Sequence, residues 1–135
     1  MPSRAEEPLR LGVDAGLWPV VRQRDVGLDQ CRFDVDVPEH LSCWPGHFPG
    51  WRVVPGTLQL YWVLVLVAHY LALPPASVRI ERVKFAAPIE PGQRLSLSLE
   101  RKPGLRVAFR FHDMDHSFSS GLLAFAGEGQ LEVEG

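Results

Sequence analysis

The segment from Gly46 to Trp62 holds the residues whose types and spacing are best suited to chemistry. It reads GHFPGWRVVPGTLQLYW, and His47 lies in it among glycines and prolines that restrict the backbone. An imidazole can take up a proton near neutral pH. Nine residues later, Gly56 is expected to begin a helix, whose first N–H groups can stabilise an oxyanion. The pattern predicts proton abstraction beside a polarised carbonyl, with apolar neighbours suited to an acyl chain.

A long apolar helix is expected to position these groups, from about residue 56 to residue 73. Residues 58–73 read LQLYWVLVLVAHYLAL, and Pro55 suits a first helical turn because no partner exists there for an N–H. The run is shorter than the roughly 20 residues needed to cross a bilayer, so no membrane span is predicted. A helix that is apolar all round should be surrounded by protein. On this view, His69 is interpreted as a core residue.

Alternation of apolar and polar residues predicts strands on both sides of the helix. Residues 1–18 are weakly patterned, and we expect a flexible or peripheral arm there. One helix and a run of strands predict a single α+β domain over residues 1–135, with a curved antiparallel sheet wrapped around the helix. Its uncovered edges favour a dimer. The expected strands cover residues 31–37, 78–85, 95–99, 107–111 and 118–125, with a short additional strand at 131–133.

Composition and charge exclude several classes of protein. A net charge of −2 gives no sign of the excess positive charge that a nucleic-acid-binding protein usually carries. Cys31 and Cys43 form no zinc-binding pattern, and no third group is evident to orient a Cys43–His47 nucleophilic pair. His112 and His116 flank an expected turn between strands, so we expect no metal site. The first residues contain no secretory signal, which favours a cytoplasmic location with reduced thiols.

The GHFPG sequence, followed by PG and an apolar helix, resembles the 3-hydroxyacyl-acyl-carrier-protein dehydratases of the hot-dog fold. The loop of that family runs H-F-P-G-x-P-x-x-P-G. The resemblance covers roughly residues 30–125 and extends towards the ApeI-like dehydratases of aryl-polyene clusters. Three further segments carry it: Gln59-Leu60-x-Trp62, VKFAAPIEPG from Val83 to Gly92, and Ser119-Ser120-Gly121.

The resemblance implies a role for each matching residue. His47 corresponds to the histidine that removes the proton at C2 of the acyl thioester. Gly56 corresponds to the glycine whose N–H polarises the thioester carbonyl. The acid of the family, a Glu or Asp from the other subunit, lies fourteen residues after the histidine, where this chain has Tyr61. Arg52 also departs from the family, which has proline there. The residues expected to contact substrate are Phe48, Pro49, Gly50, Pro55, Thr57 and Trp62.

The leading hypothesis is therefore a lyase. It would dehydrate 3-hydroxyacyl thioesters of acyl carrier protein to trans-2-enoyl thioesters, in fatty-acid or aryl-polyene biosynthesis, without cofactor or metal. A tyrosine hydroxyl can donate a hydrogen bond but is a poorer proton donor than a carboxylic acid. Asp36 and Glu39 are other carboxylates that could reach the site.

Two alternatives remain open at this point. The chain is either an enzyme on its own or a non-catalytic hot-dog subunit that binds acyl chains or pairs with an active dehydratase as a heterodimer. A third hypothesis is an acyl thioesterase, because one fold supports several reactions. Four cations either receive an acidic carrier protein or form a solvated strand face: Arg52, Arg79, Arg82 and Lys84.

Overall fold

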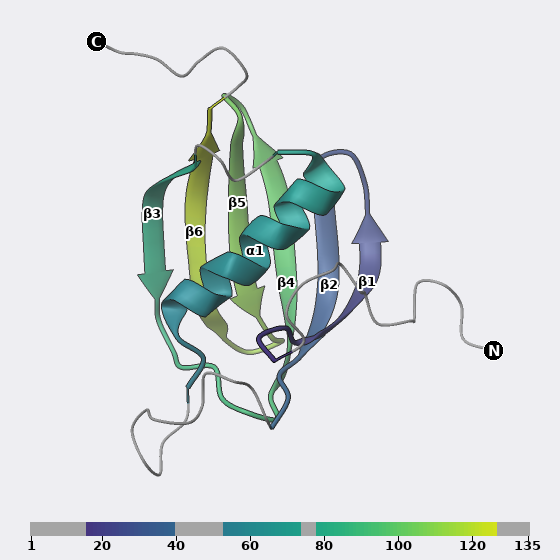
Figure 1. Cartoon of the computed structure of the whole chain (residues 1–135), viewed down its shortest axis with the longest axis vertical. Helices are drawn as coiled ribbons and strands as arrows, with labels where there is room; N and C mark the ends of the chain where they lie inside the picture. The colour runs from purple at the N-terminus through teal and green to yellow at the C-terminus, as the bar shows by residue number, and fades with distance from the viewer. Residues whose placement is uncertain (1–15, 40–52, 74–77, 127–135) are drawn as a thin grey trace, which may run out of the picture.

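A computed structural model describes residues 16–39, 53–73 and 78–126. In these residues six strands form one antiparallel sheet, and a single helix lies diagonally across one of its faces (Figure 1). The predicted α+β architecture is confirmed. The strands lie in the order β1-β2-β4-β5-β6-β3. The elements are β1 (Val20–Val26), β2 (Gln30–Asp36), α1 (Gly56–Leu71), β3 (Val78–Phe85), β4 (Arg94–Lys102), β5 (Arg106–His112) and β6 (Ser117–Phe125).

The five strands predicted between residues 31 and 125 are confirmed to within a few residues. Strand β1 was not predicted, because it is an edge strand in which only Val21 is buried. Its sequence, VVRQRDV, therefore carries almost no alternating apolar signal. The expected strand at residues 131–133 and most of the expected arm lie outside the described residues.

The core lies between α1 and the inward-facing residues of the sheet. Trp62, Val63, Leu66 and Val67 are almost completely buried on the helix side. Burying each such side chain contributes roughly 1.5–3 kcal/mol relative to leaving it in water. Their partners on the sheet are the alternating large residues that the sequence pattern predicts: Phe33, Leu97, Leu99, Phe109, Phe111 and Leu123.

The opposite side of α1 is less covered than the sequence led us to expect. Leu60, Tyr61, Leu64 and Val65 are only partly buried, and His69 is exposed in the last turn. The interpretation of His69 as a core residue is therefore wrong for the described chain: it lies on the side of the helix that the sheet does not reach. The helix ends at Leu71, two residues before the predicted end. No helix in the described ranges is long and apolar enough to cross a membrane.

An irregularity part-way along strand β3 changes which of its side chains face the helix. Ile80 pairs with Leu123 and Arg82 pairs with Leu122, so Glu81 is an extra residue in the strand. Such a β-bulge resets the alternation of side chains. Before the bulge, Ile80 lies on the helix side; after it, Val83 and Phe85 do, while Arg82 and Lys84 lie on the outer face. Strand β3 is also at the edge of the sheet, where Ile80 and Phe85 are each 51% exposed.

Candidate functional site

The start of helix α1 presents free backbone donors. Pro55 precedes the helix in an extended conformation and provides no side-chain cap. Its carbonyl accepts hydrogen bonds from the N–H groups of Leu58 and Gln59, at 3.0 and 3.1 Å. Within the described part of the chain, the N–H groups of Gly56 and Thr57 have no partner. The helix start can therefore hold a carbonyl oxygen on which negative charge develops.

Phe85 forms a wall beside this helix start. A Cβ atom built on Gly56 would lie 2.5 Å from Cζ of the Phe85 ring and 2.9 Å from both Cε atoms. A side chain at position 56 therefore has no room unless the ring moves. Phe85 is the last residue of β3, so the end of the edge strand and the start of the helix meet here. Glycine at position 56 is needed for this close approach.

A buried pair of polar side chains holds the backbone that leads into the helix. Ser119 Oγ donates to Gln59 Oε1 at 2.7 Å, and Gln59 Nε2 donates to the carbonyl of Val54 at 3.2 Å. Gln59 and Ser119 are 4% and 1% exposed. The N–H of Val54 also donates to the carbonyl of Ile89 at 2.7 Å. Residue 54 is thereby fixed to both β6 and the 89–93 turn, and the position of Gly56 follows from it.

The sequence pointed to Gln59 and Ser119 only as parts of a motif, and their shared role was missed. The available signal was a glutamine within an otherwise apolar helix, because a buried amide requires partners. Such a residue predicts a polar partner elsewhere in the core, although periodicity does not say which one.

Replacing Gln59 with leucine is expected to lower the free energy of unfolding by about 1–3 kcal/mol, because it leaves the Ser119 hydroxyl and the Val54 carbonyl unpaired. Equilibrium denaturation in urea measures the change. Adding Ser119→Ala to Gln59→Leu should recover part of the loss, since one of the two orphaned groups is then removed. The matched control is Ser120→Ala, on the outer face, which should change stability by less than about 0.5 kcal/mol. Equal stability of Gln59→Leu and wild type would contradict the network.

Tyr61 lies on the side of α1 that the sheet leaves partly uncovered. It comes five residues after Gly56, which corresponds to a rotation of about 140° around the helix axis. Its side chain is partly buried against the core, and its hydroxyl has no hydrogen-bond partner among the described residues. Within one chain, Tyr61 and Gly56 therefore lie on different sides of helix α1.

Trp62 packs in the core with 1% of its surface exposed, and its Nε1 donates to the carbonyl of Leu17 at 2.7 Å. Pro55 and Gly56 are partly buried and Thr57 is exposed at the helix start. Contact between substrate and Pro55, Thr57 or Trp62 stays a prediction. The other predicted site residues lie outside the described residues: His47, Phe48, Pro49 and Gly50, together with Arg52 and Cys43.

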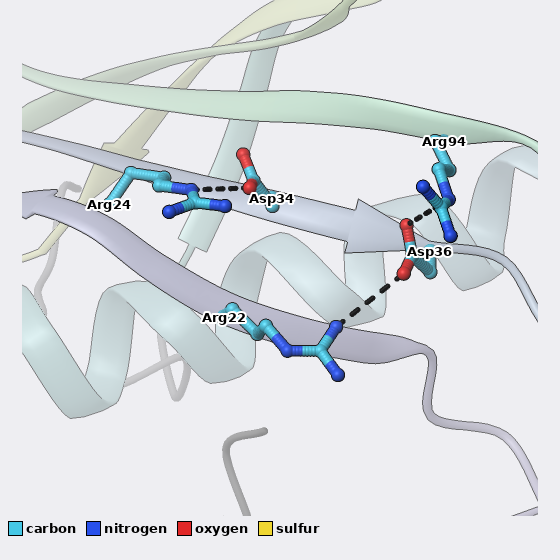
Figure 2. A network of polar contacts seen from close by, with 5 residues as sticks. All are labelled: Arg22, Arg24, Asp34, Asp36 and Arg94. Carbon is cyan, nitrogen blue, oxygen red and sulfur yellow. Dashed lines mark hydrogen bonds and ion pairs between the residues drawn. The ribbon is translucent and has the colours of Figure 1, made fainter. Parts of the chain in front are cut away.

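The two other carboxylates considered from the sequence have separate surroundings. Asp36 pairs with Arg22 at 3.5 Å and with Arg94 at 3.6 Å, on the outer face of the sheet (Figure 2). Its carboxylate is therefore turned away from the helix start. Glu39 is exposed, and its carboxylate lies against Gly92, where a Cβ atom would be 2.7 Å from Glu39 Oε2.

His112 and His116 are held in separate contacts around the predicted turn, which is confirmed. His112 Nε2 lies 2.8 Å from Ser98 Oγ, and burial and the neighbouring Arg110 lower the pKa of His112. His116 Nδ1 lies 3.5 Å from Asp113 Oδ1. Across the described ranges, no three ligand-type side chains are grouped to hold a metal ion.

Comparison with protein families identifies the family of this chain. The sequence model of a family described as ApeI-like, ApeI dehydratase, matches residues 23–122. The chain belongs to the ApeI-like dehydratase family. The ApeI-like resemblance noted in the sequence is thereby confirmed, and a dehydratase-type function follows from membership. No curated protein sequence matches the chain significantly.

Solved structures confirm the hot-dog fold of this ApeI-like chain. A subunit of the dehydratase heterocomplex ApeI:P from Xenorhabdus doucetiae is 28% identical, with a TM-score of 0.70, covering 78% of this chain and 96% of that one. An uncharacterized protein from Erwinia carotovora subsp. atroseptica is 29% identical, with a TM-score of 0.64, covering 78% and 94%. Thioesterase superfamily member 2 from Mus musculus is 15% identical with a TM-score of 0.61, covering 79% and 82%, and shares the fold.

Proposed function

We propose that this ApeI-like protein dehydrates 3-hydroxyacyl thioesters of acyl carrier protein to trans-2-enoyl thioesters. The observation that carries the proposal is the helix start, where the N–H groups of Gly56 and Thr57 are unpaired within the described chain. Donors placed at a developing oxyanion are a large source of rate acceleration in reactions that pass through an enolate. Membership in the ApeI-like family supports elimination of water as the reaction.

In this proposal His47 removes a proton from C2 of the acyl chain. Negative charge develops on the thioester oxygen and is held by the N–H of Gly56. The C2=C3 double bond forms as the C3–O bond breaks, and the departing hydroxide takes up a proton to leave as water. Tyr61 occupies the position from which the family supplies that proton. The chemistry needs no electron transfer, so the proposal includes no cofactor.

A second hot-dog subunit is part of the proposal. The partly covered face of α1 carries Tyr61, and the free edge of β3 exposes Ile80 and Phe85. Edge strands with exposed apolar residues are commonly covered by pairing with another chain. The similar structure from Xenorhabdus doucetiae is itself a subunit of a heterocomplex. We propose that the second subunit, identical or related, places a residue-61 side chain in the site of the first.

The proposal is tested by incubating the purified protein with a panel of 3-hydroxyacyl-carrier-protein thioesters and recording intact masses. Loss of one water, about 18 Da, is expected, and His47→Ala serves as the control. Release of free acid and free thiol would instead show a thioesterase. No mass change with any acyl chain, from protein that is folded by circular dichroism, would exclude the chain as an enzyme on its own. The pathway and the cytoplasmic location stay predictions from the sequence.

A non-catalytic subunit is the second candidate, and Tyr61 is the observation that favours it. A positioned general acid contributes about 10²–10⁴ in rate, so loss of the carboxylic acid at this position can silence a site. The acyl-binding part of the fold and its pairing surfaces would then serve an active partner. The similar chain from Xenorhabdus doucetiae is part of a dehydratase heterocomplex, which supports this candidate.

Changing Tyr61 separates the two candidates. If the chain is an enzyme, Tyr61→Phe is expected to lower kcat by about 10²-fold, because the hydroxyl that donates the proton is removed. If the chain is a silent subunit, the wild type is inert and Tyr61→Glu creates activity. Tyr70→Phe is the matched control on the same helix; it removes only the hydrogen bond to Gln23, at 2.8 Å. An unchanged kcat in Tyr61→Phe would rule out Tyr61 as the proton donor.

A further inference from the structure

A row of five polar residues crosses the outer face of the sheet, the face opposite α1. The strand registers place Arg32 of β2 beside Ser98 of β4, Ser98 beside Arg110 of β5, Arg110 beside Ser120 of β6, and Ser120 beside Lys84 of β3. We call these five residues the basic row. Cations and hydroxyls alternate along it, and no described helix or strand lies over it (Figure 1).

The spacing of the basic row follows from the spacing of the strands. Neighbouring strands lie about 4.8 Å apart, so cations on every second strand are roughly 9.6 Å apart. From Arg32 to Lys84 the row spans four such intervals, or about 19 Å. Its side chains are long enough to reach outward, and all three cations are exposed. The row therefore offers three positive charges at regular intervals along a line that crosses the strands.

Other arginines on this side of the protein are neutralised by carboxylates. Arg22 and Arg94 share Asp36, and Arg24 pairs with Asp34 (Figure 2). Two further arginines share Glu81: hydrogen bonds from Arg106 and then from Arg79 lower the pKa of its carboxyl to about 2.

The cations of the basic row differ from these. Within the described ranges, Arg32, Lys84 and Arg110 form no ion pair, and neither does Arg82 next to them. Four exposed positive charges are thus left without a carboxylate on one face of a chain whose net charge is −2. Such a local excess of one sign attracts a partner of the opposite sign.

The surface is also hollowed along the β3 half of the row. A depression of about 560 Å³ lies over β3, β4, β5 and β6. Its lining combines three small residues, Ser98, Ala108 and Ser120, with the unpaired cations Arg82, Lys84 and Arg110. It also includes Glu100, which is paired with Lys102 at 3.2 Å. The small side chains leave space between the long charged ones. This shape suits a rounded element lying across the strands.

We propose that the basic row docks an acidic α-helix of a partner protein, with carboxylates at every seventh residue. Seven residues of helix rise about 10.5 Å, which matches the roughly 9.6 Å between successive cations. Of the two serines between the cations, Ser98 already contacts His112 Nε2 at 2.8 Å, and Ser120 can bond to a further polar group of such a helix. This inference does not depend on the proposed reaction, since a chain that dehydrates nothing would still present the same face.

Nucleic acid fits this face less well than an acidic helix does. The basic row contains no aromatic ring on which a base could stack, as single-strand binding surfaces provide. An isolated phosphate would engage one cation of the row, because the next is roughly 9.6 Å away.

The test uses the full chain and a fluorescent helical peptide of about 22 residues with glutamate at every seventh position. Fluorescence anisotropy at low salt measures its dissociation constant. The variant Arg110→Glu with Lys84→Glu should weaken binding about tenfold or more, with a smaller difference at high salt. Arg110→Gln with Lys84→Gln should give a smaller loss and keeps the test valid if charge reversal disturbs folding. Thermal melts confirm the fold of each variant.

The control Arg94→Glu makes the same kind of charge reversal on the same face, outside the basic row, and should change affinity less than about twofold. A second peptide of identical composition with irregular glutamate spacing should bind more weakly. The proposal is overturned if the double charge reversal binds as the wild type does, or if both peptides bind equally. It is also overturned if a single-stranded oligonucleotide or inorganic phosphate displaces the peptide at equal concentration of negative charge.

Discussion

Replacing His47 with alanine is expected to lower the rate of dehydration by about 10²–10⁴-fold, because the proposed base is removed. The other described histidines are not placed to substitute for it. His69 lies in the last turn of α1, at the end far from Gly56, and His112 and His116 flank the turn between β5 and β6. Intact-mass measurement of enoyl product over time gives the rate for each variant.

The matched control for His47→Ala is His116→Ala, an exposed imidazole in a turn, which should leave the rate within about threefold of wild type. Circular dichroism and thermal melting then separate a lost base from a lost fold. A His47→Ala variant that is folded and retains the wild-type rate would show that another group removes the proton. That result would leave the role of the Gly56 N–H intact and require a different base.

Replacing Gly56 with alanine is expected to lower kcat by about 10²–10³-fold, the usual cost of disturbing an oxyanion donor. The added methyl would lie 2.5–2.9 Å from three atoms of the Phe85 ring. The helix start or the ring must therefore move. A shift of the helix start turns the N–H away from the place where the oxyanion forms, and a shift of the ring changes the wall of the site beside it. Steady-state kinetics should show the loss mainly in kcat, because charge develops on the oxygen only in the transition state.

A second variant tests the stated cause. If the clash with Phe85 is responsible, Gly56→Ala combined with Phe85→Leu should recover at least about tenfold of the lost kcat, because two residues in contact do not act additively. The matched control is Gly27→Ala in the β1–β2 turn, which lies near the opposite end of α1 from Gly56 and should leave kcat unchanged. No recovery in the double variant, with its fold intact, would mean that the methyl itself blocks the substrate.

The sequence predicted the central part of the fold because that part obeys simple patterns. Strands β2, β4 and β5 alternate strictly between buried and outward residues, and α1 is a continuous apolar run. Strand β1 escaped prediction because an exposed edge strand buries too little to leave a pattern. The partial exposure of α1 was not predicted either, because an apolar composition does not show whether a helix face is covered by the same chain or by another one.

The candidate site was predictable only as separate parts. The motif indicated that Gly56 begins the helix and that Tyr61 replaces an acid, and the structure places both on α1. The contact between Gly56 and Phe85 joins residues 29 positions apart and has no local signature. The same is true of the hydrogen bond from Ser119 to Gln59, which spans 60 positions. Contacts of this kind depend on how the strands pair, which alternation alone does not determine.

The bulge at Glu81 has a consequence for how the length of β3 can change during evolution. Without Glu81, Ile80 and Arg82 would follow one another in ordinary alternation, so Phe85 would still face Gly56 and Lys84 would still face outward. Loss of one residue after the bulge, with the bulge retained, would exchange these two directions. Position 81 is therefore where a one-residue gap is tolerated, at the cost of the ion pairs with Arg79 and Arg106. Sequences aligned across β3 should place their gaps there.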